Sequence, residues 1–341
     1  MNKIIRRAFA LATITLLACA GLKAQDQEDE DINPGVWSAR VRNEKVYIQF
    51  GGLHWSDGVT FNLPELGPLP EGQAGSFTVK REPGTVTFTG TFAAGVGHGT
   101  YAFAPNPDFK AFLTQQGFKD VSESLMIHLF FTNINHEYFD YMKANGYSGI
   151  TIEQLKHLAY ADVNKPTFVS YVDLSKQQGW GRLSIDNIIE MHDHGASPAF
   201  VKRFLDLGYK DISIEQAVEL VDHGVSADYI RSLQGMGYTG LTPEKAIELV
   251  DHGVSAEFIR GFQNIGYKEM PLDRAVELQD HGVSPEFVKS FKDLGFADLS
   301  LNKAVELQDH GVSADFIKRM QDKGLKGLSI DQYIRIHDAG M

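Results

Sequence analysis

Glutamate, aspartate and histidine recur together in the second half of the chain at a fixed interval of 29 residues. An Asp-His-Gly triplet carries each repeated histidine, and a glutamate stands four residues before it. The histidines are His194, His223, His252, His281 and His310, and the glutamates are Glu190, Glu219, Glu248, Glu277 and Glu306. Residues four apart share one helix face, so each repeat places a carboxylate beside an imidazole. Such a pair could ligate a metal or transfer protons.

The repeat geometry argues against a shared metal centre. Zinc ligands lie about 2.0–2.2 Å from the metal, whereas packed helices lie about 8–10 Å apart. A histidine at a helix C-terminus also interacts favourably with the helix dipole. Acidic and basic ladders on neighbouring repeats can pair for modest stabilisation. We therefore favour a structural role, and a metal buffer built from these ladders is the alternative.

A cation recurs in the same register, at Lys202, Arg231, Arg260, Lys289 and Lys318. No residue is assigned to catalysis, to a cofactor or to a metal. If the repeats bind a partner, the candidate residues are Glu219, His223, Arg231, Glu248, His252, Arg260, Glu277, His281 and Lys289.

The elements that carry these residues are two short helices per repeat. Ser213 is placed to cap a helix that ends at Gly224, and Ser226 to cap a second helix that ends at Gly237. Helices of about ten residues are unstable alone in water. A repeat of this length therefore predicts a stacked α-solenoid in which each unit buries its apolar face against its neighbours.

The array begins near Asn106 and contains about seven to eight helical hairpins. Glycines that end the second helix are spaced 29 residues apart, except for one step of 33 residues. We assign the extra residues, around Gln177 to Gly181, to a loop. An aromatic column at Phe200, Tyr229, Phe258, Phe287 and Phe316 is expected to form a continuous core.

The segment from Trp37 to Phe103 alternates apolar and polar residues with a period of two. It predicts a small β meander of five or six strands, either a sandwich or a partial barrel, that packs against the first helices. Gly95 to Gly99 is expected to form a hairpin loop that joins the last two strands. His54 and Trp55 lie in a glycine-rich loop and could contact a sugar or a peptide.

Residues 1–24 have the layout of a secretory signal peptide, with cleavage after Ala20 or Ala24. Cys19, the only cysteine, ends the apolar run in a sequence that resembles a bacterial lipobox, so it is a candidate lipidation residue. We therefore expect a periplasmic or secreted protein, or alternatively an outer-membrane lipoprotein. No other apolar run is long enough to span a bilayer.

The net charge of the chain favours some classes of binding partner over others. Removal of residues 1–24 would leave 28 Lys and Arg against 44 Asp and Glu, a net charge of −16. Such a charge disfavours nucleic acid and anionic lipid, and it favours a protein or peptide, particularly a basic one. The expected organisation is a multidomain α+β chain with a signal peptide (1–24), an acidic linker (25–35), a β domain (36–105) and the helical repeats (106–341).

Repeats of the form Gly-Val-Ser-Pro/Ala-Glu/Asp-Phe-Val/Ile-Lys, and the lead-in from Gly97 to Asn106, resemble a known family. They are similar to the extracytoplasmic regions of bacterial membrane metallopeptidases of the beta-lactam-sensor (antirepressor) type and to their stand-alone secreted relatives. The resemblance implies a sensing or partner-binding ectodomain. Peptidase activity does not carry over, because His136-Glu137 is followed by Asp140 where the zinc-protease motif has its second histidine.

Two functions are therefore weighed. The first is a non-enzymatic extracytoplasmic scaffold that binds a protein or peptide along the repeats and needs no cofactor. The alternative is a β domain that binds or hydrolyses a polysaccharide or peptide, with the repeats as a spacer. The sequence does not determine the oligomeric state.

Overall fold

The computed structural model describes residues 34–51 and 56–340. The predicted signal peptide, Cys19, most of the acidic linker, His54 and Trp55 lie outside the described residues. The chain divides into two compact units after Ile152. Strands give way to helices at Asn106, so the first helical copies belong to the same unit as the sheet.

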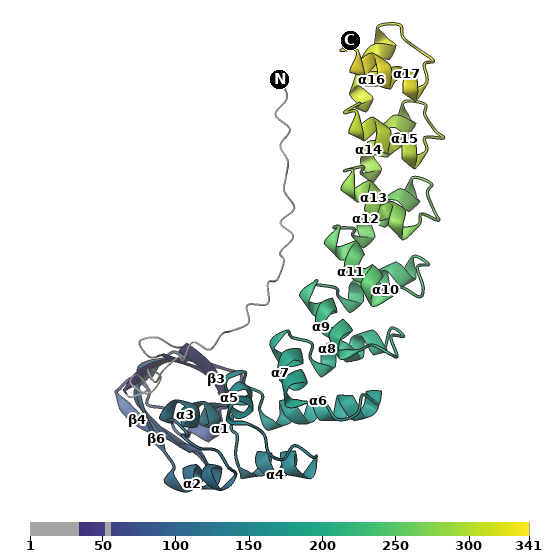
Figure 1. Cartoon of the computed structure of the whole chain (residues 1–341). Helices are drawn as coiled ribbons and strands as arrows, with labels where there is room; N and C mark the ends of the chain where they lie inside the picture. Colours follow the sequence, from purple (N-terminus) through teal and green to yellow (C-terminus); the bar gives the residue numbers. More distant parts are fainter. Residues whose placement is uncertain (1–33, 52–55, 341) are drawn as a thin grey trace. The chain divides into compact units, whose positions relative to one another are not determined.

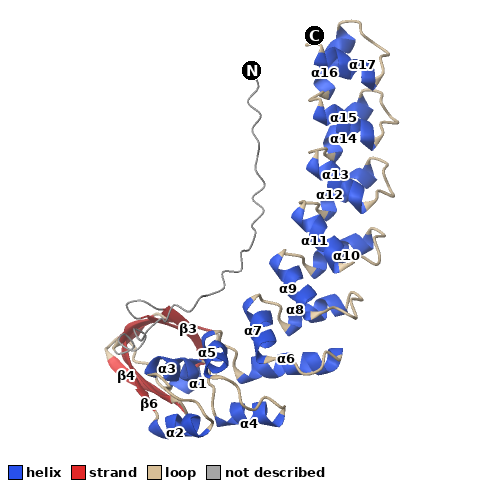
Figure 2. Ribbon diagram, viewed as in Figure 1, coloured by secondary structure: helices blue, strands red, loops and turns tan. Residues whose placement is uncertain are grey.

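The first unit contains a six-stranded antiparallel sheet that curls into a half-barrel (Figures 1 and 2). The strand order is β3-β2-β1-β6-β5-β4, so the predicted meander is in fact two three-stranded meanders joined where the first strand pairs with the last. The strands are β1 (Gly35–Arg42), β2 (Lys45–Gly51), β3 (Ser56–Asn62), β4 (Gly75–Arg81), β5 (Gly84–Ala93) and β6 (Val96–Pro105).

Helix α3 packs against the concave side of the curled sheet (Figure 1). Its sequence is apolar on nearly every face, and seven of its nine residues are buried, as expected for a helix that is enclosed by other elements. Phe131 at its end packs against Phe50 of β2 with ring centroids 4.4 Å apart. The helices of this unit are α1 (Leu63–Leu66), α2 (Pro107–Gln115), α3 (Glu123–Phe131) and α4 (His136–Ala144).

Arg81, at the end of β4, holds the C-terminus of α3. Its guanidinium donates hydrogen bonds to the carbonyl oxygens of Phe130 (2.7 Å) and Phe131 (2.8 Å), two of the carbonyls that a helix leaves without internal partners at its end. The same guanidinium lies over the ring of Phe61, 4.9 Å from its centroid. A largely buried cation is therefore matched by the negative end of a helix dipole.

Two strand glycines let β5 and β6 approach closely. Gly90 and Gly99 face each other in the ladder, and a Cβ at Gly99 would lie 2.0 Å from the carbonyl oxygen of Thr89. The expected loop from Gly95 to Gly99 is therefore wrong: only Ala94 and Gly95 form the turn, and the later glycines belong to β6. The glycine-rich composition reflects close contact between strands, not a flexible loop.

The second unit is an array of helical pairs stacked in a row (Figure 1). Odd-numbered helices pack on odd-numbered helices of the next repeat, and even-numbered on even-numbered. The odd-numbered helices are α5 (Ile152–Tyr160), α7 (Ile185–Asp193), α9 (Ile214–Asp222), α11 (Pro243–Asp251), α13 (Leu272–Asp280), α15 (Leu301–Asp309) and α17 (Ile330–Asp338). The even-numbered helices are α6 (Lys165–Gln178), α8 (Pro198–Leu205), α10 (Ala227–Gly235), α12 (Ala256–Asn264), α14 (Pro285–Asp293) and α16 (Ala314–Asp322).

The predicted caps are confirmed. Ser213 and Ser226 accept hydrogen bonds from backbone amides in the first turns of α9 and α10. Gly224 and Gly237 follow these helices with φ angles of 69° and 99°, in the left-handed region that favours glycine. Both helices of this repeat thus end at the glycines that the spacing predicted.

The apolar core of the array differs in one column from the prediction. Phe200, Tyr229, Phe258 and Phe287 are only half-buried, and only Phe316 in that column is buried. The fully buried column lies four residues later, one helical turn further into the stack. It consists of Phe204, Leu233, Phe262, Phe291 and, at the last position, the nearly buried Met320.

The extra residues of the long repeat lie in a helix, which corrects their expected place in a loop. Helix α6 has 14 residues, whereas its equivalents in the later repeats have eight or nine. Gly179 ends it with a φ of 70°. A helix extends readily when its sequence contains no breaker, so the glycine after Gln178 decides where it stops.

Tyrosine and tryptophan side chains link several repeats to the next through backbone carbonyls. Tyr238 donates to Met270 (2.8 Å), Trp180 to Ile212 (3.1 Å) and Tyr267 to Leu299, each across 32 residues. Tyr209 occupies the equivalent position, but its buried hydroxyl has no hydrogen-bond partner among the described residues. The residue at this position therefore donates a hydrogen bond to the next repeat in some repeats, but Tyr209 does not.

This difference gives a matched pair of tests. Tyr238→Phe should lower the free energy of unfolding by about 0.5–1.5 kcal/mol, because it removes a hydrogen bond between repeats. Tyr209→Phe should cause no loss, because its hydroxyl is buried without a partner. Urea denaturation followed by circular dichroism measures both, and equal losses for the two variants would contradict the assignment.

Gly99→Ala should destabilise the first unit by about 1–3 kcal/mol or more, because the added methyl group overlaps the backbone of β5. Gly58→Ala is the control. It also adds a methyl group to a strand glycine, but its nearest neighbour would be the side chain of Gln49 at 3.4 Å. Chemical denaturation should show a loss for Gly99→Ala alone; a stable Gly99→Ala variant would show that the strands are further apart than described.

Candidate functional site

The repeated histidines form a ladder with the aspartates of the following repeat. In four pairs the histidine Nδ1 lies 2.7 Å from a carboxylate oxygen: His194–Asp222, His223–Asp251, His252–Asp280 and His281–Asp309. In the fifth pair, His310 lies 3.1 Å from Asp338. The imidazole therefore pairs between repeats, and the glutamate on its own helix face is not its partner.

This ladder lies on the surface. The paired histidine and aspartate side chains are about 39–48% exposed. Exposed ion pairs contribute little to stability, since water and salt screen them. The hydrogen bond to Asp222 raises the pKa of His194, and the nearby Glu190 and Asp193 act in the same direction. The His–Asp pairs therefore orient neighbouring repeats but contribute little to the free energy of unfolding.

A second ladder joins the first turns of the odd-numbered helices. Lys245 lies 2.5 Å from Asp273, and Lys303 lies 2.6 Å from Asp331, in each case 28 residues further along the chain. Gln216 donates to Glu244 in the same way, at 2.7 Å. Hydrogen bonds to Asp273 and Glu248 raise the pKa of Lys245, so this cation stays charged across the physiological range.

The predicted cation column does not take part in these ladders. Arg231 pairs with Asp228 and Lys289 with Asp293 (2.6 Å), both within their own even-numbered helix. Arg260 is exposed and has no ion pair among the described residues. These cations therefore do not pair with the acidic column as expected. The charged contacts between repeats are instead those of the His–Asp and Lys–Asp ladders. The nine candidate residues divide between two sets of helices: the glutamates and histidines belong to odd-numbered helices and their C-caps, the cations to even-numbered helices.

Charge is strongly segregated between the two sets of helices. From α7 to α17, the odd-numbered helices contain sixteen Asp and Glu but four Lys and Arg, a net charge of −12. The even-numbered helices α8 to α16 contain six acidic and eight basic residues, a net charge of +2. We call the exposed side of the odd-numbered helices, represented by Glu219, Glu248 and Glu277, the acidic face.

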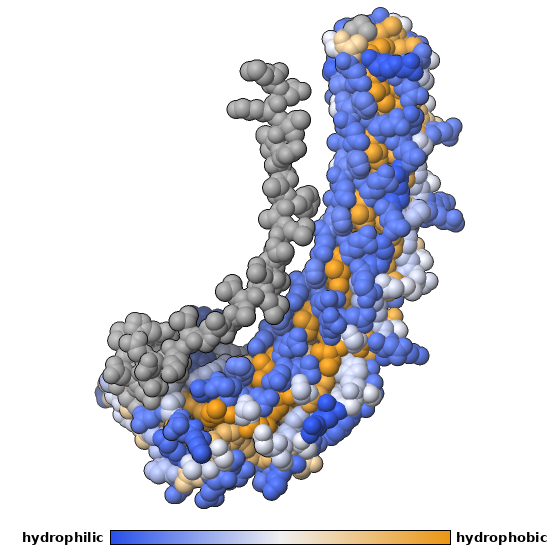
Figure 3. Space-filling model, viewed as in Figure 1, coloured by the Kyte–Doolittle hydropathy of each residue, from blue (hydrophilic) through white to orange (hydrophobic). Residues whose placement is uncertain are grey.

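Hydrophobic residues run in a line along the second unit, bordered by hydrophilic residues (Figure 3). Partly buried apolar side chains of the array include Tyr229, Phe258 and Phe287, which pack against the core. Tyr229 is held by a hydrogen bond from its hydroxyl to the carbonyl of Val254 (2.7 Å), two residues after His252 in the chain. The array thus has partly exposed aromatic rings close to the His–Asp ladder.

The described residues contain no group of three or more His, Cys, Asp or Glu side chains that could hold a metal ion. None of the described helices is both long and apolar enough to cross a membrane.

His136 of the discarded protease-like motif lies at the start of α4, where its Nδ1 is 2.5 Å from the carboxylate of Glu82. Burial alone would raise the pKa of Glu82, but the hydrogen bonds from His136 outweigh it and lower that pKa.

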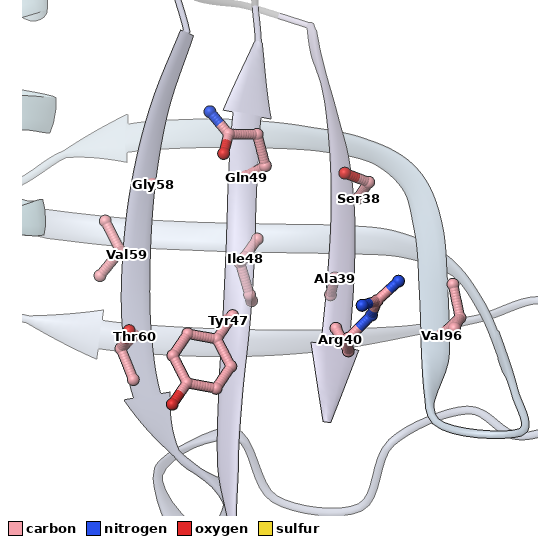
Figure 4. A pocket seen from close by; sticks show the side chains of 10 residues that line it. All are labelled: Ser38, Ala39, Arg40, Tyr47, Ile48, Gln49, Gly58, Val59, Thr60 and Val96. Atoms are coloured by element: carbon pink, nitrogen blue, oxygen red, sulfur yellow. The ribbon is translucent and has the colours of Figure 1, made fainter. Parts of the chain in front are cut away.

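A hollow on the sheet was not foreseen. It has a volume of about 410 Å³ and lies on the outer side of β1, β2 and β3, next to the start of β6 (Figure 4). It is lined by Ser38, Ala39, Arg40, Tyr47, Ile48, Gln49, Gly58, Val59, Thr60 and Val96. The alternation of exposed residues along each strand could have placed Tyr47 and Gln49 on one face. It could not have given the pairing of β1 with β6, which brings Val96 beside Arg40.

No model of a known protein family matches the chain, and a search of curated proteins finds no significant match.

The His194–Asp222 pair predicts a pH dependence. Because the folded-state pKa of His194 is raised, the pair should stabilise the protein fully below about pH 6.5, and this contribution should be lost as the pH rises through the folded-state pKa. Asp222→Asn should return the pKa of His194 toward its ordinary value and remove at most about 1 kcal/mol of stability. An NMR titration of the His194 ring measures the shift. Asp206→Asn, which removes another exposed carboxylate, is the control and should leave the titration unchanged.

Proposed function

We propose that this protein is a non-enzymatic extracytoplasmic scaffold that binds a basic protein or peptide along the acidic face of its repeats. The observation that carries the proposal is the segregation of charge: a net −12 on the odd-numbered helices against +2 on the even-numbered helices. Salt bridges within the array do not require such segregation, because a balanced surface would serve them equally well. A field of one sign steers an oppositely charged partner and selects against others.

The regular spacing of the carboxylates supports an extended partner. Contacts such as Lys245–Asp273 and His252–Asp280 join residues 28 positions apart in successive repeats, so neighbouring repeats present their acidic residues in the same orientation. Glu219 has no ion pair among the described residues, and Glu248 is paired only with Lys245 of its own helix (2.5 Å). A partner with several cations would add weak contacts along the row, and their sum would give the affinity.

The proposed location follows from the N-terminal sequence and from the resemblance to extracytoplasmic repeat regions of beta-lactam-sensor type metallopeptidases. Residues 1–24 have the pattern of a signal peptide, which supports a periplasmic or secreted protein. Lipidation of Cys19 would instead place it in the outer membrane. By the same resemblance, the repeats would act in envelope sensing through a bound protein and without a cofactor.

Charge reversal on the acidic face tests the proposal. A triple variant, Glu219→Lys, Glu248→Lys and Glu277→Lys, should weaken binding of a lysine-rich peptide by at least about tenfold, which corresponds to about 1.4 kcal/mol. Isothermal titration calorimetry measures the affinity. Binding by the unmodified protein should also weaken as the salt concentration rises, because salt screens exposed charges.

The matched control places the same change in charge on the even-numbered helices. Asp228→Lys, Glu257→Lys and Glu286→Lys alter three exposed carboxylates at equivalent positions of the same three repeats. This variant should bind the peptide with affinity within about twofold of the unmodified protein. Equal losses in both variants would mean that net charge alone attracts the peptide, and the acidic face would not be a binding surface.

A further inference from the structure

The hollow on the outer side of β1, β2 and β3 has the features of a ligand site in a part of the chain that the proposed function does not use. Register places Arg40 beside Tyr47 and Ser38 beside Gln49, with Thr60 next to Tyr47 on β3. Figure 4 shows these five side chains gathered around the hollow. Ala39 and Ile48 also line the hollow, but they alternate with these residues along the strands and are themselves buried.

The polar side chains around the hollow have no partners within the described chain. The side chains of Ser38, Arg40, Tyr47, Gln49 and Thr60 make no hydrogen bond or ion pair with any described residue. Together they offer a guanidinium, an amide and three hydroxyl groups. Ligand sites combine an apolar surface with a few convergent polar groups of this kind.

The hollow also offers an aromatic surface. Tyr47 is 48% exposed and Val96, at the start of β6, is 50% exposed, which are large values for side chains of their size in strands. Gly58 of β3, which lies opposite Gln49, has no side chain of its own to fill the hollow. A ring that is apolar on its faces and polar at its edge would contact Tyr47 and still reach the hydrogen-bonding groups.

Charge indicates the type of ligand. Arg40, Arg42 and Lys45 lie on the same side of the β1–β2 hairpin, although the chain as a whole has a net charge of −12. Asp57 of β3 faces the other side, where its carboxylate lies 4.0 Å from Nε2 of His128. The Arg40 guanidinium can bind a carboxylate through two parallel hydrogen bonds.

From these observations we infer that the hollow binds an acidic saccharide, with a sugar ring on Tyr47 and its carboxylate on Arg40. Gln49, Ser38 and Thr60 would donate to and accept from the ring hydroxyls. A neutral sugar would leave the guanidinium without a partner, and an extended peptide would pair with the edge of β3 in preference to the face of the sheet.

The test uses the full chain and a short oligogalacturonate, with a neutral cello-oligosaccharide of the same length for comparison. Calorimetry should show binding of the acidic sugar and at least about tenfold weaker binding of the neutral one. Arg40→Gln and Tyr47→Ala should each weaken binding of the acidic sugar by a similar factor. Both side chains are exposed, so folding should be unchanged by circular dichroism.

Lys80→Gln is the matched control, because Lys80 is an exposed cation on the same side of the sheet but on β4, the strand at the opposite edge. Its loss should leave the affinity unchanged. Equal weakening by Lys80→Gln, unchanged binding by Arg40→Gln, equal affinity for the neutral sugar, or no binding of either sugar would overturn the inference. None of these outcomes bears on peptide binding by the acidic face, which is carried by other residues.

Discussion

Burial between neighbouring repeats is the interaction on which the second unit depends. A helix of nine residues forms too few internal hydrogen bonds to offset the entropy of its own formation. Ala217, Leu220, Ile230 and Leu233 are fully or almost fully buried in one repeat, and equivalent residues are buried in the next. These side chains leave water only when another repeat lies beside them. The unit of stability is therefore the contact between repeats, not the repeat itself.

This division leaves the surface free for other roles. The His–Asp and Lys–Asp ladders lie outside the core and are exposed to water, so they add little free energy. They orient the repeats and fix the positions of the acidic side chains. The odd-numbered helices can therefore vary their exposed residues without loss of the core, and the segregation of charge is a feature that packing does not require.

Much of the architecture could be predicted because it is encoded locally. Helix ends can be predicted within a few residues from the capping serines, such as Ser213 and Ser226, and from the glycines that follow the helices. The constant interval between repeats predicts that the helices stack. What could not be predicted depends on contacts between distant residues. The pairing of β1 with β6 places Val96 beside Arg40 at the hollow, and the pairing of Gly90 with Gly99 shows that an expected loop is part of a strand. The buried aromatic column was misplaced by one turn because both columns repeat with the same interval, and only packing distinguishes Phe258 from Phe262.

Contacts that recur between the same two positions of successive repeats have a consequence for the history of the chain. His223 meets Asp251 in the same geometry in which His252 meets Asp280. Removal or duplication of one complete repeat would restore every such contact at the new junction. Gene recombination could thus lengthen or shorten the array one repeat at a time, whereas an insertion of any other length must be absorbed inside an element, as the long helix α6 absorbs its additional residues.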